Sequence, residues 1–364
     1  MEKQSKKMVL FLTILFLGWS IVCWLKPAEE FSITERRKLA QFPKLSMETI
    51  SDGSFMEDFE SYTLDQFPIR DGFRSLKAWV SKGIFRKSDE HHIYVRDGHA
   101  VKMEYPLKEE SLTNALKKFE AVYQTYLKNH AGKIYAAIVP DKNYFLGESN
   151  GYLTMDYKSL YETMEQGMEY AEFIEITDLL EADDYYKTDL HWRQECLQDV
   201  ALRMAQTMNV DLPGKYEMKT LPKDFYGVYF GQTALNLPGE PLNYLTNDVL
   251  EQCSVYHYEN GKTTPIYDLS KAEGEDLYEI FLSGPISLQT IENPAAKTEK
   301  ELIVFRDSFG SSLIPLLAEG YRKVTLIDIR YIQRDFLANF VDFQDKDVLF
   351  LYSTVVLNNS MSLR

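Results

Sequence analysis

An aspartate and a histidine stand two positions apart at Asp189 and His191, in a chain that has 6 histidines among its 364 residues. In a turn, an aspartate at this spacing can bend back onto one ring nitrogen of the histidine. The other ring nitrogen is then left to accept a proton, as the base of a serine-dependent catalytic triad does. A second interpretation of the same residues has Asp189 as the cap of the following helix and His191 at the surface.

A candidate nucleophile stands at Ser308. The apolar run at 302–305 predicts a strand, and residues 306–310 turn from it into a helix. A serine at this corner presents its hydroxyl beside backbone N–H groups of a helix N-terminus, which can stabilise an oxyanion. The alternative is that Asp307 and Ser308 are ordinary helix caps. The turn differs from the G-x-S-x-G elbow of α/β-hydrolases, because Arg306 occupies the position of the first glycine.

Two basic side chains also follow predicted strands. Arg330 could bind a substrate oxygen or carboxylate, or it could pair with Asp328 or Asp307. Lys142 follows an earlier strand, and the same alternatives apply to it.

No metal or cofactor site is predicted. The remaining histidines have no metal-ligand spacing on a helix, and the cysteines form no CxxC or Cys/His cluster. A disulfide framework is not indicated either, although a single bridge between Cys196 and Cys253 stays open.

Alternating strands and helices position these groups. Predicted strands cover 133–139, 172–180, 301–305, 323–327 and 347–352, and predicted helices cover 109–129, 157–170, 192–208, 311–319 and 333–340. This order predicts an α/β fold with a mostly parallel sheet covered on both faces. Residues 210–290 interrupt it with glycines, prolines and short aromatic strands, which indicates a β-rich insertion. Reactive groups collect at the carboxyl ends of strands in such sheets. Both halves of the proposed triad follow strands, which favours Ser308–His191–Asp189 as a unit.

The N-terminus predicts a membrane anchor. Residues 8–25 are an uncharged run that follows Lys3, Lys6 and Lys7. As a helix the run is about 27 Å long, close to the thickness of a bilayer core. The preceding lysines favour a cytoplasmic N-terminus and an extracytoplasmic remainder. A cleaved signal peptide is the alternative.

The expected organisation is a cytoplasmic tail at 1–7, a transmembrane signal anchor at 8–25, a helical stalk with a hairpin at 26–105, and the α/β domain at 106–364. Within the stalk, two short helices are expected on either side of Pro68, and the hairpin is expected to turn at residues 96–98.

Composition limits the partners. The formal net charge of −15 argues against nucleic-acid binding, which requires a basic surface. The 24 tyrosines and 21 phenylalanines suit a second class of function, a non-catalytic glycan-binding or scaffold protein of an envelope assembly. A separation above about 4 Å between Ser308 and His191 would count against the enzyme and for this alternative.

Four segments in combination resemble the DHHW proteins, which are bacterial membrane-anchored proteins similar to the alginate O-acetylation proteins of the SGNH hydrolase-like superfamily. The segments are KTDLHW at 187–192, FRDSFGSSLIPLL at 305–317, LIDIRYI at 326–332 and DQFPIRDGF at 65–73. The name-giving Asp-His-His-Trp reads Asp-Leu-His-Trp here, because Leu190 replaces the first histidine.

The resemblance implies a flavodoxin-like, three-layer α/β/α (SGNH-like) fold and a Ser308–His191–Asp189 triad. It also implies an oxyanion glycine and asparagine, for which Gly284 and Asn293 are the candidates. The implied activity is that of a serine O-acyltransferase or acetylesterase acting on a cell-envelope polysaccharide. A single anchor helix cannot pass an acyl group across a membrane. A cytoplasmic acyl donor would therefore require a separate membrane-bound, acyl-exporting partner.

Overall fold

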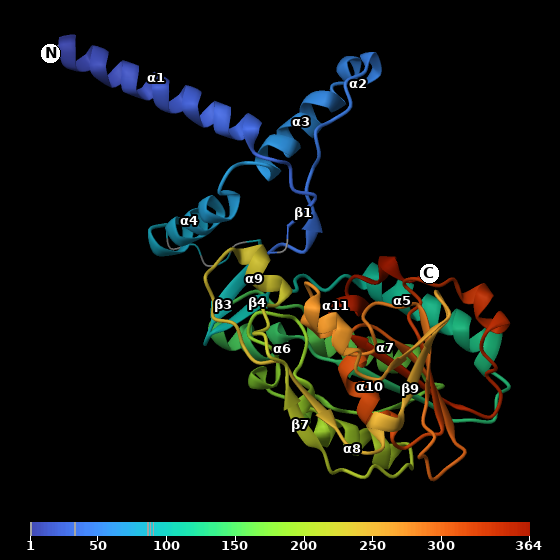
Figure 1. Ribbon diagram of the computed structural model, residues 1–364. Helices are drawn as coiled ribbons and strands as arrows, with labels where there is room; N and C mark the ends of the chain where they lie inside the picture. Colours follow the sequence, from blue (N-terminus) through green and yellow to red (C-terminus); the bar gives the residue numbers. More distant parts are fainter. Residues whose placement is uncertain (1, 33, 86, 88, 90) are drawn as a thin grey trace. The chain divides into compact units, whose positions relative to one another are not determined.

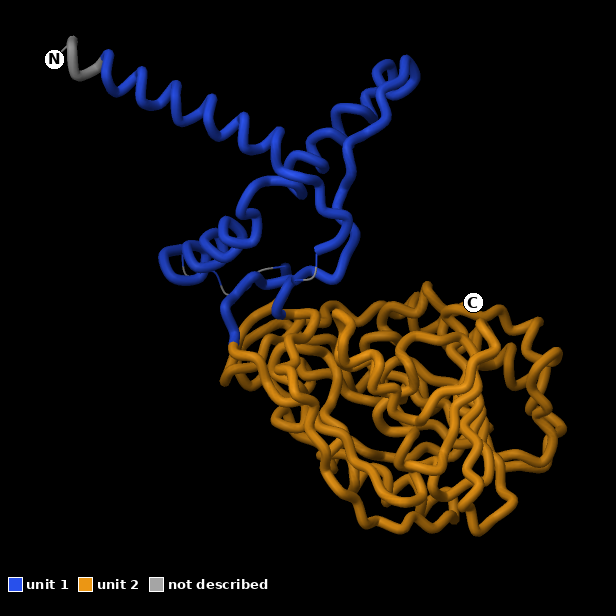
Figure 2. Tube along the Cα trace, viewed as in Figure 1, with its two compact units in different colours: residues 1–91, 230–237 blue, residues 92–229, 238–364 orange. Residues whose placement is uncertain are grey.

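The computed structural model describes residues 2–32, 34–85, 87, 89 and 91–364, and it divides into two compact units (Figure 2). The first unit consists of the described residues up to His91 together with Phe230–Leu237. The second unit consists of His92–Tyr229 and Pro238–Arg364. Residue 1 of the expected cytoplasmic tail lies outside the described residues. The hairpin that was expected in the stalk belongs to the second unit.

The first unit is built from short elements around one long helix (Figure 1). The long helix is α1 (Glu2–Leu25), which over Lys6–Leu25 is apolar and long enough to cross a membrane, a property that signal sequences share. The other elements are β1 (Phe31–Ser32), β2 (Arg37–Lys38), α2 (Met47–Ser51), α3 (Ser54–Asp65) and α4 (Arg70–Gly83). Helices α3 and α4 confirm the two predicted on either side of Pro68.

The second unit contains an eight-stranded sheet with the order β10-β9-β11-β13-β12-β14-β5-β6. These strands are β5 (Ile134–Val139), β6 (Glu172–Phe173), β9 (Ser254–His257), β10 (Lys262–Pro265), β11 (Leu288–Glu292), β12 (Glu301–Arg306), β13 (Lys323–Ile327) and β14 (Asp347–Ser353). From β13 to β6 all neighbours are parallel, whereas β11, β9 and β10 join by antiparallel pairing. The mostly parallel sheet predicted from the sequence is confirmed.

Both faces of the sheet carry apolar packing, as the alternation of side chains along β12 illustrates. Leu302 and Val304 join one buried cluster, and Ile303 and Phe305 join the other. The first cluster includes side chains of α8 (Gln198–Thr207) and α10 (Gly310–Ala318), and the second includes side chains of α5 (Glu109–Val122) and α7 (Tyr157–Gly167). Central parallel strands covered on both faces are continuously apolar for this reason.

Shorter elements complete the described chain. The strands are β3 (Ile93–Arg96), β4 (His99–Lys102), β7 (Glu217–Thr220) and β8 (Asn243–Thr246), and the helices are α6 (Lys142–Leu146), α9 (Val228–Thr233) and α11 (Thr354–Leu357). A π-helix covers Tyr123–Leu127, and 3-10 turns include Gln194–Cys196, Leu277–Ile280 and Arg334–Asn339. The β3–β4 hairpin confirms the one predicted with its turn at 96–98.

Three sequence predictions need correction. The strand expected at 172–180 is limited to the two residues of β6, and the helix expected at 333–340 is a 3-10 helix. The insertion expected at 210–290 is in part continuous with the central sheet. Strands β9 and β10 from that segment extend the sheet through the pairing of β9 with β11, and Val255 packs in the same apolar cluster as Leu302 and Val304.

Candidate functional site

Ser308, His191 and Asp189 form a continuous chain of polar contacts. The Oγ of Ser308 lies 2.8 Å from Nε2 of His191, and Nδ1 of the same ring lies 2.6 Å from Oδ1 of Asp189. Ser308 stands just beyond the carboxyl end of β12, two residues before α10 begins. The three residues named from the sequence are therefore within hydrogen-bond reach of one another, in the order that nucleophile, base and orienting acceptor require.

The Asp189 carboxylate is buried and held from two sides. Its Oδ1 accepts the backbone N–H of His191 at 3.0 Å, and its Oδ2 accepts the N–H of Val228 at 2.9 Å. The side chain is far from any role as a helix cap, because α8 begins only at Gln198, with Leu197 in the cap position. The alternative of a capping Asp189 with a surface His191 is wrong, since the two residues are 1% and 8% exposed.

Gly227 allows the chain to approach Asp189 closely. A Cβ on this glycine would lie 2.3 Å from the Cβ of Asp189 and 2.4 Å from the carbonyl oxygen of Thr188. The Gly227 N–H also donates to the Oγ1 of Thr188 at 2.9 Å. The close approach lets the neighbouring Val228 amide reach the Asp189 carboxylate.

Tyr278 supports the His191 ring, and no sequence pattern pointed to it. The two rings are stacked, with centroids 4.0 Å apart and planes 9° apart. The Tyr278 hydroxyl shares a hydrogen bond with Oγ of Ser312 at 2.9 Å and donates to the carbonyl of Ser308 at 3.3 Å. Trp192, next to the histidine, donates its indole N–H to the carbonyl of Phe309 and to Ser312. These contacts fix the histidine against the turn that carries the serine.

In the turn at residues 307–310, one backbone N–H group is free to donate a hydrogen bond to an oxyanion. The N–H groups of Phe309 and Gly310 donate within the turn, to Oδ1 and to the carbonyl of Asp307. Across the described residues, the Ser308 N–H makes no hydrogen bond. Asp307 is fully buried and also accepts the N–H and hydroxyl of Ser353 at 2.8 and 2.6 Å. Asp307 therefore shapes the turn, while the Ser308 hydroxyl is directed to His191.

The structure does not bring Gly284 and Asn293 into an oxyanion site. The N–H of Gly284, which has a φ of +88°, donates to the carbonyl of Phe281 in a local turn. Asn293 follows the antiparallel strand β11, whose last residue pairs with Lys323 at the start of β13. It consequently lies at the amino ends of β12 and β13, whereas Ser308 lies beyond their carboxyl ends. Its amide donates to the carbonyl of Ala318. The Asn293 prediction is wrong because β11 runs against its neighbours.

Arg330 pairs with an aspartate. Its Nε and Nη2 contact the two oxygens of Asp328 at 2.9 and 2.6 Å. Of the alternatives open from the sequence, the structure shows the pairing with Asp328. Arg306, where a hydrolase elbow has glycine, is buried and donates to Ser311 and Gln289.

Lys142 is buried beside the Asp189 turn. Its Nζ donates to the carbonyl oxygens of Tyr186 and Lys187 at 2.9 and 3.2 Å, and it lies 5.3 Å from the ring centroid of Tyr229. Burial lowers the pKa of this ammonium to about 7, against an opposing effect of the Asp189 charge. Its hydrogen bonds brace the backbone that leads into the Asp-x-His turn.

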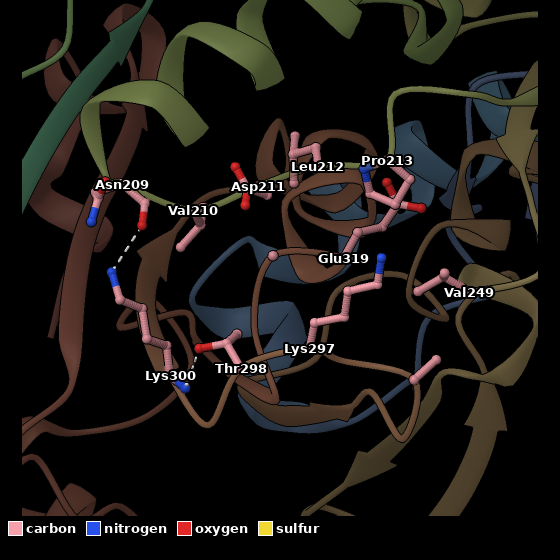
Figure 3. A pocket seen from close by; sticks show the side chains of 12 residues that line it. Asn209, Val210, Asp211, Leu212, Pro213, Val249, Lys297, Thr298, Lys300 and Glu319 are labelled. Atoms are coloured by element: carbon pink, nitrogen blue, oxygen red, sulfur yellow. Dashed lines mark hydrogen bonds between the residues drawn. The ribbon is translucent and has the colours of Figure 1, made fainter.

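A cavity of about 350 Å³ lies apart from these residues (Figure 3). Its lining includes Lys297, Lys300 and Glu319, which precede β12 and β13, so it opens at the edge of the sheet opposite Ser308. Lys300 donates there to the carbonyl of Asn209 at 3.0 Å. Within the described parts of the chain, no group of three or more histidine, cysteine, aspartate or glutamate side chains could hold a metal ion.

The sequence matches no family model, and no curated protein matches it. Among solved structures, a DHHW family protein from Eubacterium siraeum is 18% identical with a TM-score of 0.59, and the match covers 74% of this chain and 93% of that one. PatB1 from Bacillus cereus is 18% identical with a TM-score of 0.58, covering 73% and 96%. A structure of PatB1 with a sulfonyl adduct has a TM-score of 0.56 at the same identity, covering 73% and 97%. The resemblance to DHHW proteins predicted from the motifs is confirmed at the level of the fold.

Proposed function

We propose that this chain is a membrane-anchored, SGNH-like serine O-acyltransferase or acetylesterase that acts on a cell-envelope polysaccharide outside the cytoplasm. The observation that carries the proposal is the pair of contacts from Ser308 Oγ to His191 and from His191 to Asp189. The substrate class rests on the resemblance of the four sequence segments to DHHW proteins. The fold shared with a DHHW family protein and with PatB1 is consistent with it.

In the first half of the reaction, Nε2 of His191 takes the proton from Ser308 as Oγ attacks the acyl carbonyl carbon. Asp189, on the other ring nitrogen, stabilises the imidazolium that forms. The carbonyl oxygen becomes negatively charged in the tetrahedral intermediate. It then accepts a hydrogen bond from the backbone N–H of Ser308, which stabilises this charge. The tetrahedral intermediate collapses when the bond to the donor alcohol breaks, and His191 returns the proton to that alcohol. The product is an acyl ester on Ser308.

The second half repeats these steps with a new acceptor. His191 deprotonates a sugar hydroxyl or a water molecule, whose oxygen attacks the acyl-serine carbonyl. Collapse of this second intermediate breaks the bond to Ser308 Oγ, which regains its proton from His191. A sugar acceptor makes the protein a transferase and water makes it an esterase.

Helix α1 supports the membrane location in this proposal, because its uncharged run from Met8 to Leu25 is long and apolar enough to cross a membrane and follows Lys3, Lys6 and Lys7. We assign the rest of the chain to the extracytoplasmic side. One span provides no path for an acyl group, so a cytoplasmic donor requires a multi-span exporting partner.

The competing function, a glycan-binding or scaffold protein without turnover, gains no support from the site. The distance of 2.8 Å between Ser308 and His191 lies well within hydrogen-bond reach. A buried carboxylate aligned on the second ring nitrogen is also a costly arrangement to maintain for binding alone.

Two assays on the full-length chain in detergent test the proposal. The first follows hydrolysis of an aryl acetate and transfer of its acetyl group to an oligosaccharide. The second treats the protein with a sulfonyl fluoride and locates the adduct by peptide mass spectrometry. We expect modification at Ser308 and loss of both activities in Ser308→Ala, but not in Ser149→Ala, a variant of an exposed serine of the same unit. Equal turnover by Ser308→Ala and the unaltered chain would refute the triad.

A further inference from the structure

Helix α4 presents three large apolar side chains to solvent. Phe73, Leu76 and Trp79 are 49%, 54% and 63% exposed, while Ala78 and Ser81 are buried. At 3.6 residues per turn the three large apolar residues form one stripe on the helix. The helix of a soluble domain buries such a stripe, whereas among the described residues this one stays about half exposed.

Polar contacts fix this orientation within the first unit. Arg74 donates to the carbonyl of Gly231 at 2.7 Å and pairs with Glu35 at 3.1 Å. Arg70 pairs with the same glutamate at 2.5 Å. The arginines are on the side of the helix opposite Leu76 and Trp79, so turning the apolar stripe inward would break both ion pairs.

The exposed stripe is continuous with the candidate membrane span. The ring of Trp19 in α1 packs against Phe67 and Phe73, with centroids 5.8 and 6.3 Å apart. Trp19 precedes the end of α1, at Leu25, by about 9 Å of helix at 1.5 Å per residue. Side chains in contact with Trp19 would thus lie about 5–10 Å below the surface of a bilayer that α1 spans, which is the depth of interfacial amphipathic helices.

We propose that α4 lies in the outer interface of the membrane, with Phe73, Leu76 and Trp79 inserted among the lipid chains. This proposal rests on the assignment of α1 as a membrane anchor. Tryptophan is enriched at this depth because its ring is apolar and its N–H is polar. Lys77 and Lys82 border the stripe on its two sides, where long basic side chains reach lipid phosphates. The first unit then has two attachments to the bilayer instead of one.

Nitroxide labels on the full-length chain in nanodiscs of phosphatidylcholine and phosphatidylglycerol test this inference. The three native cysteines are replaced, and single labels are introduced by Leu76→Cys, Trp79→Cys and, as a control away from the stripe, Asp71→Cys. Asp71 is exposed on the same helix and lies about 140° around it from Leu76. A label from Leu15→Cys reports on α1 independently. Collision with oxygen, which dissolves in lipid, is compared with collision with a water-soluble nickel chelate.

We expect the ratio of oxygen to nickel collisions to be high at positions 76 and 79 and low at position 71. Nickel access at position 76 equal to that at position 71 would place the stripe in water and overturn the proposal. Exclusion of both reagents would show a protein surface over the stripe and would overturn it equally. If either result is found while the label at position 15 collides with oxygen and not with nickel, α4 insertion is refuted and α1 is still a membrane anchor. Nickel access at position 15 would refute both the anchor and α4 insertion.

Discussion

The Tyr278 ring lies parallel to the imidazole of His191, with a centroid separation of 4.0 Å. Its hydroxyl contacts Ser312 on α10 and the carbonyl of Ser308. One side chain thus contacts both the His191 ring and the turn that carries Ser308. This makes Tyr278 a positioning residue of the proposed triad.

Tyr278→Ala should lower kcat for acetyl-ester hydrolysis by roughly fivefold, because a stacked ring contributes about 1 kcal/mol to fixing its partner. KM should change little, since the ring positions the base. Tyr278→Phe keeps the stack and should retain most of the rate. Tyr256→Ala, which removes a half-exposed tyrosine of β9, is the control. A rate for Tyr278→Phe as low as that of the alanine variant would assign the effect to the hydroxyl and contradict the stacking role.

Asp189→Asn should lower kcat by about 10³-fold or more, because the amide cannot stabilise the imidazolium. The double variant Asp189→Asn, His191→Ala should have a kcat only slightly below that of His191→Ala alone, since the residues of a triad act as one unit. Steady-state kinetics of the two single variants and the double variant measure this coupling. Losses that multiply in the double variant would mean that the two residues act independently.

Gly227→Ala should reduce turnover while the protein remains folded. The new methyl group would lie 2.3 Å from the Cβ of Asp189, so the carboxylate must move away from the Val228 amide. Gly83→Ala is the matched control, because a Cβ there meets its nearest neighbour at an ordinary 3.8 Å. Circular dichroism and ester hydrolysis on the same samples separate misfolding from loss of activity. Full activity in Gly227→Ala would show that the position of Asp189 tolerates displacement.

Lys142 should make the stability of the fold depend on pH. Burial lowers its pKa from 10.5 to about 7, so between those values the unfolded chain binds the proton and the folded chain does not. Stability from this group therefore rises with pH across that window, by at most about 1.4 kcal/mol per pH unit. Below pH 7 both states are protonated, and the full cost of burying the charge is present.

Urea denaturation at several pH values from 7 to 10 measures this slope. Lys142→Met should flatten it, even if the loss of the bonds to Tyr186 and Lys187 shifts all values by a constant. Lys158→Met removes an exposed lysine and should leave the slope unchanged. An unaltered slope in Lys142→Met would mean that the buried amine stays protonated throughout.

The sequence predicted those parts of the site whose signals are local. Ser308 follows the recognisable strand β12, and Asp189 and His191 stand in a short polar motif. The strand expected before that motif ends at Phe173, so a position at a strand end points to Ser308 alone. Tyr278, Gly227 and Val228 could not be found this way. They belong to the irregular segment at 210–290 and reach the triad through tertiary contacts that no periodicity records.

Asn293 illustrates a different limit. Strand β11 (LQTIE) is not among the strands predicted from the sequence, and the direction of a strand is not encoded in its composition. Because it runs antiparallel to β13, the residue at its end lies on the wrong edge of the sheet. Leu190, in contrast, is partly buried against the apolar cluster that includes Leu302, and its side chain takes no part in the hydrogen bonds of Asp189, His191 and Ser308. This packing suits an apolar residue where the family motif has its first histidine.

Two contacts of the proposed triad limit how far the chain can be shortened. The Val228 amide donates to Asp189, and the Tyr278 ring stacks on His191. Both residues belong to the segment at 210–290, which interrupts the regular alternation of strands and helices and therefore looks dispensable. A trimmed version that joined α8 directly to β11 would keep Ser308, His191 and Asp189 in its sequence, but the base and its carboxylate would have lost their supports. The smallest form of this protein that keeps the proposed triad in place must retain that segment.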